Sequence, residues 1–254
     1  MIVYRFDGSF DGLLTAVFDS FARKERPDML LAPCGEQPLF CDLVHEVVTD
    51  IGKGSRLWRK LGKVISSGAR TALATAFLTD NPDFPLAALR YISRAVVSAR
   101  SIETDFSDPS VLAVLKEARR VRGEAHRLLQ FVRFQKAVDG TYFSMVEPIF
   151  DVLPFAVRHF ADRFSDQAFI IYDRSRDYGY HYDGRELSRI TLSSDSYHMS
   201  TGRLSDSMMD PHEKLYQELW RTYVRSIAIA ERTNPRKQRQ DMPVRFWKYL
   251  TEMQ

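Results

Sequence analysis

The chain of 254 residues contains few cysteines and no long hydrophobic run. Its two cysteines, Cys34 and Cys41, are too few for a disulfide framework or a cysteine metal site. No apolar stretch approaches the roughly 20 residues that a membrane-spanning helix needs. The N-terminal segment reaches the charged Asp7 too early for a secretion signal. These absences predict a cytoplasmic protein that holds no metal and no cofactor and does not enter a membrane.

The sequence also lacks the motifs of several enzyme classes. The GKGS stretch at Gly52–Ser55 has no upstream glycine to complete a phosphate-binding loop, so it predicts the start of a helix. His45 and His212 are each followed by a glutamate, but neither has the second histidine of a zinc-protease motif. No serine lies in a GxSxG elbow, and no closely spaced cysteine triplet is present to hold an iron–sulfur cluster. The sequence therefore does not establish an enzyme.

What is present is an ordinary globular composition with a small excess of positive charge. Hydrophobic residues make up 44% of the chain and charged residues 27%, which is typical of a soluble globular protein. The net charge of +3 is too small to indicate nucleic-acid binding without local clusters of Arg and Lys. Because no stretch has the composition of a linker, we predict one domain over residues 1–254.

The hydrophobic periodicity predicts an α+β fold, mostly helical with a small mixed or antiparallel sheet. A proline-rich stretch at 26–40 and a serine-rich stretch at 193–210 predict loops. The expected parts are an N-terminal strand (2–6), a helix (10–21), a second strand (43–48), a helical part (about 50–136), a strand-containing part (about 137–192) and C-terminal helices (212–252).

One long helix, expected between residues 108 and 137, carries two stripes. Its apolar stripe recurs every three or four residues and consists of Val114, Ala118, Val121, Ala125, Leu128 and Val132. A second, basic stripe about a quarter to a third of a turn away consists of Arg119, Arg122, His126, Gln130 and Arg133. Guanidinium groups beside a buried face suit the phosphate oxygens of a ligand in a groove. The alternative is a boundary stripe that pairs with carboxylates such as Glu124 or Asp162. Phe131 and Phe134 lie off the apolar stripe and predict burial on two sides, with stacking on bases as the alternative.

Two further clusters combine ionisable side chains with an apolar support. His159 and Arg163 are one helical turn apart, and His159 fits an anion donor, an acid–base or a structural role. Asp173 and Arg176 follow an apolar strand, and a rigid support of this kind favours a functional site. An Asp–Arg clamp across a turn explains the same residues.

The C-terminal region is rich in arginine. We expect Arg221, Arg225 and Arg232 to follow one helix face into a basic segment with Arg236, Lys237 and Arg239. Beyond this segment a short helix is expected to turn Phe246, Trp247 and Leu250 inward. A basic segment held at both ends favours an anion-binding loop, with a solvated connector as the alternative. The candidate phosphate-binding residues are thus Arg119, Arg122, His126, Arg133, Arg163, Arg176, Arg232, Arg236, Lys237 and Arg239.

Several motifs, taken together, resemble those of one bacterial family. They are YRFDGSFDGLLTAVFDSF, HRLLQFVRF with YFSMVEP, HFADRF, IIYDRSR and MPVRFWKYLTE, and they occur in order along nearly the whole chain. The sequence is similar to bacterial DNA metabolism (DNA repair) proteins of unknown function. This resemblance implies a radical-SAM protein as a partner, and related domains occur fused to a uracil-DNA glycosylase domain. It implies no catalytic residues, because the activity of the family itself is not established.

The sequence supports three hypotheses. The first is an accessory protein of DNA metabolism that binds DNA through Arg and Lys and acts with a radical-SAM or uracil-DNA glycosylase partner. The second is an enzyme acting on a nucleotide or nucleic acid, with His159 and Asp173 as catalytic candidates. It requires His159, Asp173, Arg133 and Arg163 to meet in one pocket. The third is a protein–protein scaffold without DNA contact.

Overall fold

The computed structural model describes residues 1–33, 35–98, 100–193 and 202–254, so Cys34 and part of the predicted serine-rich loop lie outside the described residues. Helix predominates over strand in these ranges, which confirms the α+β class. None of the helices in them is long and apolar enough to cross a membrane. The contacts gather in two compact units, Met1–Gly123 and Glu124–Gln254. The single domain stays a prediction, because two compact units can fold together or independently.

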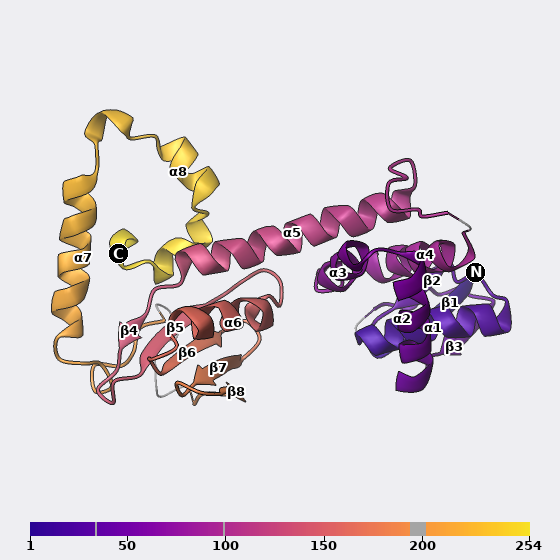
Figure 1. The fold of residues 1–254 in the computed structure, drawn as a ribbon, viewed down its shortest axis with the longest axis horizontal. Helices are drawn as coiled ribbons and strands as arrows, with labels where there is room; N and C mark the ends of the chain where they lie inside the picture. The colour runs from indigo at the N-terminus through magenta and orange to yellow at the C-terminus, as the bar shows by residue number, and fades with distance from the viewer. Residues whose placement is uncertain (34, 99, 194–201) are drawn as a thin grey trace. The chain divides into compact units, whose positions relative to one another are not determined.

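The N-terminal unit is built on a parallel three-stranded sheet in the order β2-β1-β3 (Figure 1). Val3 and Tyr4 of the central strand are both fully buried. Because successive side chains point to opposite faces of a sheet, both faces of β1 are covered. The elements of this unit are β1 (Ile2–Arg5), α1 (Phe10–Arg23), β2 (Met29–Leu31), β3 (Leu43–Glu46), α2 (Ile51–Val64), α3 (Ser67–Ala76), α4 (Phe84–Val97) and the first part of α5 (Pro109–Phe131).

The first two helices begin just beyond strands of this sheet. Ser9 caps α1 by accepting a hydrogen bond from the Gly12 N–H at 2.9 Å. Asp50 caps α2 by accepting from the Lys53 N–H at 3.0 Å, so the helix start that GKGS predicts is confirmed. The Asp7 carboxylate joins the two loops, because it accepts from the Ser9 N–H at 2.9 Å and from the Thr49 hydroxyl at 2.8 Å.

Two short strands are missing from the sequence prediction. The long helix expected between residues 108 and 137 is wrong beyond Phe131, where α5 ends and Gln135–Lys136 forms β4 instead. The loop predicted over residues 26–40 is wrong at Met29–Leu31, which forms β2. This strand pairs in parallel with β1, with Leu30 opposite Tyr4. Three residues are too few to show a periodic pattern, and the strand is fixed by a partner from a distant part of the sequence.

The C-terminal unit contains a mixed five-stranded sheet in the order β4-β5-β6-β7-β8. The strands β5 and β6 are parallel and α6 connects them, whereas the other pairs are antiparallel. A Cβ atom at Gly179 would lie 2.6 Å from the carbonyl oxygen of Ile171, so the close pairing of β6 and β7 requires glycine there. The strands and helix of this part are β4 (Gln135–Lys136), β5 (Tyr142–Val146), α6 (Leu153–Arg163), β6 (Phe169–Asp173), β7 (Tyr178–Tyr182) and β8 (Leu187–Ile190).

The last part of the chain leaves the sheet and returns to it. It runs along α7, turns at η2 and comes back through α8 (Figure 1). We call residues 213–241 the arch. Phe246 and Leu250 are buried and the Trp247 indole donates to the Met242 carbonyl at 2.9 Å, which confirms the predicted inward turn. The elements are α7 (Glu213–Ile227), η2 (Ala230–Arg232), α8 (Pro235–Asp241), η3 (Val244–Tyr249) and η4 (Thr251–Met253), of which η4 packs on α7.

Candidate nucleic-acid interface

Arg133, one of the predicted phosphate-binding residues, is engaged inside the C-terminal unit. Its Nη2 atom lies 2.6 Å from Oε1 of Glu252, and its Nη1 atom donates to the carbonyl oxygens of Gln130 and Val132 at 3.0 and 3.1 Å. The Trp220 indole donates to the same carboxylate at 3.0 Å. Burial raises the pKa of Glu252, but the hydrogen bonds from Arg133 and Trp220 outweigh it and hold the pKa below its ordinary value. This network ties the end of α5 to α7 and η4.

Asp173 and Arg176 form the clamp that was the alternative to a site. Asp173 is fully buried and accepts from Arg176 Nη1 at 2.9 Å and from the Ser175 N–H at 3.0 Å. Arg176 also donates to the carbonyl oxygens of Pro148 and Ile149 at 3.1 and 2.8 Å. Burial raises the pKa of Asp173, and its bond to Arg176 only partly opposes this. The pair therefore fastens the β6–β7 turn to the chain that follows β5.

The two stripes predicted on α5 are present. Arg119 and Arg122 are exposed and belong to the N-terminal unit, whereas the exposed His126 belongs to the C-terminal unit and lies 3.0 Å from the Gln130 side chain. Glu124 is buried but pairs with Arg127 and Arg245, not with the stripe. The apolar positions that are buried are Val114, Ala118, Val121, Leu128 and Val132, and Ala125 is half-buried.

His159 and Arg163 are both exposed on α6. The Arg163 guanidinium lies 5.7 Å from the centre of the Phe164 ring. Arg133 lines a pocket near α7, but the lining of that pocket includes neither His159, Arg163 nor Asp173. The enzyme hypothesis required all four side chains in one pocket, so the geometry does not favour it.

Phe131 and Phe134 pack against other aromatic side chains of the C-terminal unit. The Phe131 ring centre lies 5.0 Å from that of Phe246. Phe134 lies at 5.7 Å from both Phe164 and Phe169. Both side chains are half-buried, and Phe134 lies beyond the end of α5 at Phe131, so the packing of Phe131 on Phe246 bears out burial on a second side of the helix end for that residue alone.

The basic segment of the arch is open to solvent. All residues from 225 to 241 are exposed. Lys237 pairs with Asp241 at 2.7 Å. In the part of the chain that the structure describes, Arg232, Arg236 and Arg239 form no ion pair, so their guanidinium groups remain available to an anion.

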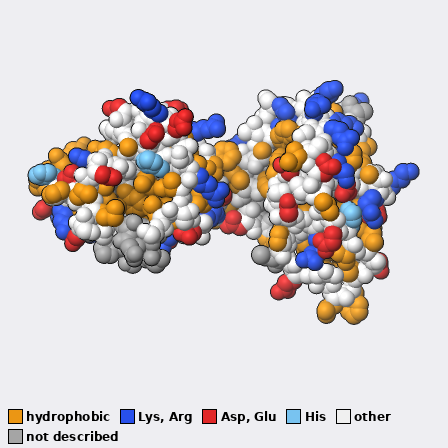
Figure 2. Space-filling view, turned by 90° about the horizontal axis from the view of Figure 1, so that it is seen from below, with side chains coloured by type: hydrophobic (Ala, Val, Ile, Leu, Met, Phe, Trp, Pro, Cys, Tyr) orange, Lys and Arg blue, Asp and Glu red, His pale blue; other side chains and the backbone are white. Residues whose placement is uncertain are grey.

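An aromatic row on α7 was not identified from the sequence. Tyr216, Trp220 and Tyr223 are 59%, 39% and 53% exposed, and the last two ring centres lie 5.7 Å apart. The helix instead buries the polar residues Glu213 and Gln217. Glu213 accepts from the Lys136 N–H, and Gln217 accepts from Arg203. Hydrophobic side chains reach the surface of both units beside Lys and Arg (Figure 2).

The aromatic row continues into a pocket of about 450 Å³ at the base of α7. Tyr216, Trp220 and Phe134 supply its aromatic walls, and Thr251 supplies a hydroxyl group, whereas the Gln217 amide in the lining is bonded to Arg203 and Glu213. A flat heteroaromatic ring fits such a lining, because its faces contact the rings while its edge meets the polar atoms.

This part of the chain also carries the family match. Residues 82–252 match the family described as "Domain of unknown function (DUF4130)". The chain belongs to the DUF4130 family. The match extends from just before α4 to η4, so both the arch and the aromatic row lie inside the DUF4130 region. No curated protein and no solved structure matches the chain.

Proposed function

We propose that this DUF4130 protein is an accessory protein of DNA metabolism that binds single-stranded DNA on its arch. The observation that carries the proposal is the exposure of Tyr216, Trp220 and Tyr223 on a helix whose buried residues are the polar Glu213 and Gln217. Base–aromatic stacking stabilises a bound strand by about 1–3 kcal/mol per base. Three rings on one helix face therefore supply enough free energy to hold a short single strand.

The phosphate contacts come from the segment that follows the aromatic row. At 100° per residue, Arg221 and Arg225 lie about 140° and 180° around the helix axis from Tyr216. They point away from a strand that stacks on the row. Arg232, Arg236 and Arg239 lie beyond α7, so the geometry of that helix does not fix the direction of their side chains. Their exposed guanidinium groups supply the cationic side of the site.

A single strand fits this surface better than a duplex. In a duplex the faces of the bases are covered by neighbouring bases, so the aromatic side chains of α7 have no base face on which to stack. In a single strand each base can rotate out and stack on a side chain. Of the seven basic residues of the arch, Lys214 and Lys237 are paired with Asp206 and Asp241, which leaves fewer cations for the two phosphate backbones of a duplex.

The accessory role rests on the resemblance to DNA metabolism proteins. Catalysis would come from a partner, a radical-SAM protein or a uracil-DNA glycosylase, to which the arch presents the strand. Pull-down of such a partner with the full chain, before and after nuclease treatment, separates an association through DNA from a direct one.

Fluorescence anisotropy tests the binding itself. At low salt we expect a labelled single strand to bind about tenfold more tightly than the same sequence as a duplex. Trp220→Ala should weaken single-strand binding by about tenfold, whereas Arg225→Ala on the far side of α7 is the matched control with a small effect. Equal affinity for the two DNA forms, with no loss in Trp220→Ala, would reject the proposal.

A protein partner is the second candidate occupant of α7. Leu215, Leu219 and Ile227 are more than half exposed. Aliphatic side chains do not stack on bases as aromatic rings do, so this apolar surface also suits a protein partner. This scaffold function predicts association with a protein that survives nuclease treatment, in a chain that shows no affinity for single-stranded DNA at low salt.

A further inference from the structure

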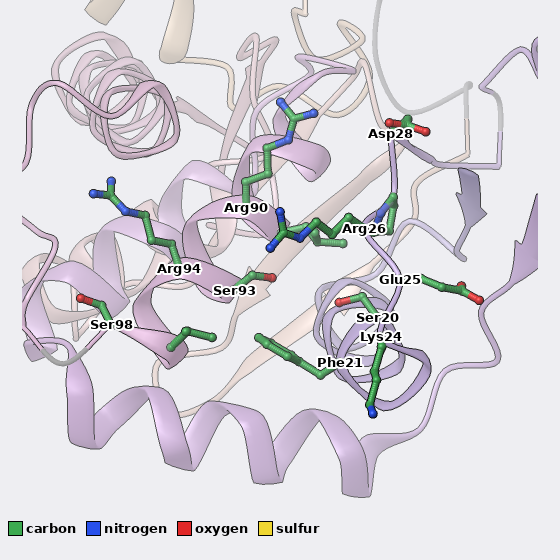
Figure 3. Close-up of a pocket in the computed structure, with 13 residues that line it drawn as sticks. Ser20, Phe21, Lys24, Glu25, Arg26, Asp28, Arg90, Ser93, Arg94 and Ser98 are labelled. Atoms are coloured by element: carbon green, nitrogen blue, oxygen red, sulfur yellow. The ribbon is translucent and has the colours of Figure 1, made fainter. Parts of the chain in front are cut away.

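A larger cavity, of about 890 Å³, lies within the N-terminal unit between the end of α1, the loop to β2 and α4. This volume falls within the range of about 300–1,000 Å³ that is usual for small-molecule sites. Four basic side chains and two acidic ones line it, together with an apolar floor (Figure 3). The basic residues are Lys24, Arg26, Arg90 and Arg94, and the acidic residues are Glu25 and Asp28.

Both acidic side chains are already engaged by groups other than the arginines of the cavity. Glu25 accepts from the Tyr4 hydroxyl at 2.7 Å and from Arg23 Nε at 3.0 Å. Asp28 accepts from the Ile2 N–H at 2.7 Å. Neither carboxylate therefore forms an ion pair with Arg26 or Arg90, and three of the four basic side chains of the lining, Lys24, Arg26 and Arg90, face two acidic ones.

Two arginines face the cavity without a counterion. In the described part of the chain neither Arg26 nor Arg90 forms an ion pair, whereas Arg94 pairs with Asp105 at 2.6 Å. Figure 3 shows Arg26 extending from the loop toward α4, where Arg90 and Ser93 lie. Both arginine side chains are exposed, and the paired N–H donors of a guanidinium group match the oxygens of a phosphate.

Ser93 supplies an independent observation at the same place. Its Oγ atom is buried and has no hydrogen-bond partner among the described residues. A buried hydroxyl without a partner is unfavourable for the folded state, so a persistent one indicates a group that binds there. The carbonyl oxygens at the C-terminal end of α1 would repel an anion in the cavity. The Lys24 N–H donates to those of Ser20 and Phe21, which reduces this repulsion.

The remaining wall of the cavity is apolar. Phe21 is 39% exposed, and Leu89, Pro27 and Val97 complete the surface around it. An inorganic anion alone would leave this wall in contact with water. A ligand that joins a phosphate to a flat ring system covers both the basic and the apolar sides.

We propose that this cavity binds a nucleoside phosphate, with the phosphate held by Arg26, Arg90 and the Ser93 hydroxyl and the base placed against Phe21. The site is formed by the N-terminal unit alone, so it is separate from the single-strand site on the arch. It assigns a small-molecule ligand to a part of the chain for which the DNA-binding proposal gives no role.

Isothermal titration calorimetry on the full chain, with AMP, adenosine and inorganic phosphate as probes, tests this site. We expect saturable AMP binding that is about tenfold tighter than the binding of either fragment. Arg26→Ala and Arg90→Ala should each weaken AMP binding by about tenfold. Arg59→Ala, an exposed arginine of α2 outside the cavity lining, is the matched control and should bind AMP like the wild type.

Ser93→Ala gives a readout that a structural role would not produce. Because the hydroxyl has no partner in the free protein, its removal should leave the Tm unchanged or raise it while AMP binds several-fold more weakly. The proposal is overturned if the wild type shows no saturable AMP binding at millimolar concentration, or if Arg26→Ala and Arg90→Ala bind AMP unchanged. Phosphate binding as tight as that of AMP would overturn the assignment of the nucleoside.

Discussion

Arg133 and Glu252 are 119 positions apart in the sequence, and Nη2 of the arginine lies 2.6 Å from Oε1 of the glutamate. Their side chains are 27% and 10% exposed. Trp220 donates to the same carboxylate, so this pair joins the end of α5 to η4 and to the helix that carries the aromatic row. One carboxylate therefore links three elements of the C-terminal unit, including the helix of the candidate site.

Replacing Arg133 with alanine should destabilise the protein by about 2 kcal/mol, because it leaves the Glu252 carboxylate largely buried without its cation. Urea unfolding followed by tryptophan fluorescence measures this. The matched control is Arg158→Ala, an exposed arginine of α6, for which we expect a change within about 0.5 kcal/mol. Equal stabilities of the two variants would show that the ion pair contributes nothing.

The depressed pKa of the Glu252 carboxylate predicts that the stability of the protein depends on pH. The folded-state pKa of Glu252 is depressed, so its stabilisation is present above the ordinary pKa of about 4.3 and is lost as the pH falls through the folded-state value. The difference in stability between the wild type and Glu252→Gln should therefore shrink between about pH 5 and pH 3. Denaturant unfolding at several pH values checks this, and a difference that grows in acid would contradict it.

Asp173→Asn separates a structural role from a catalytic one. We expect the free energy of unfolding to fall by about 2–3 kcal/mol, because the Arg176 guanidinium keeps its carbonyl partners but loses its buried counterion. Single-strand affinity should stay within about twofold of the wild type once the variant is folded. Thermal unfolding and anisotropy measured on the same sample decide the matter. A variant of native stability that fails to bind DNA would make Asp173 a binding or catalytic residue again.

Gly12 is required by the carboxylate beside it. A Cβ atom there would lie 2.1 Å from Oδ1 of Asp7, so Gly12→Ala should disturb the Asp7 network and destabilise the protein by about 2 kcal/mol or more. Gly123 is the matched control, because a Cβ atom added there would meet no described atom within 4 Å. Gly123→Ala should stabilise α5 by up to about 1 kcal/mol. Thermal unfolding of both variants tests the contrast in sign.

The sequence predicts features that depend on local periodicity and misses those that depend on a distant partner. The buried stripe of α5 follows from its spacing, and the start of α2 follows from the GKGS stretch. The face that α7 presents does not, because Glu213 and Gln217 are buried by partners elsewhere in the chain and the rings are left outside. Likewise, the sequence around Asp173 and Arg176 fits both a functional site and a structural clamp. Only the burial of Asp173 in the structure distinguishes these two roles.

Single-strand binding on the arch predicts a salt dependence that its arginines determine. For single strands the slope of log K against log salt is about −0.7 for each phosphate that is neutralised. Replacing Arg232, Arg236 and Arg239 together with alanine should therefore make the slope shallower by about 2, whereas the Arg221→Ala/Arg225→Ala double variant should change it little. The decisive measurement is anisotropy with single-stranded DNA across a range of salt concentrations for these three proteins. A slope that the triple variant shares with the wild type, or a wild type that does not bind at low salt, would contradict a DNA site on the arch.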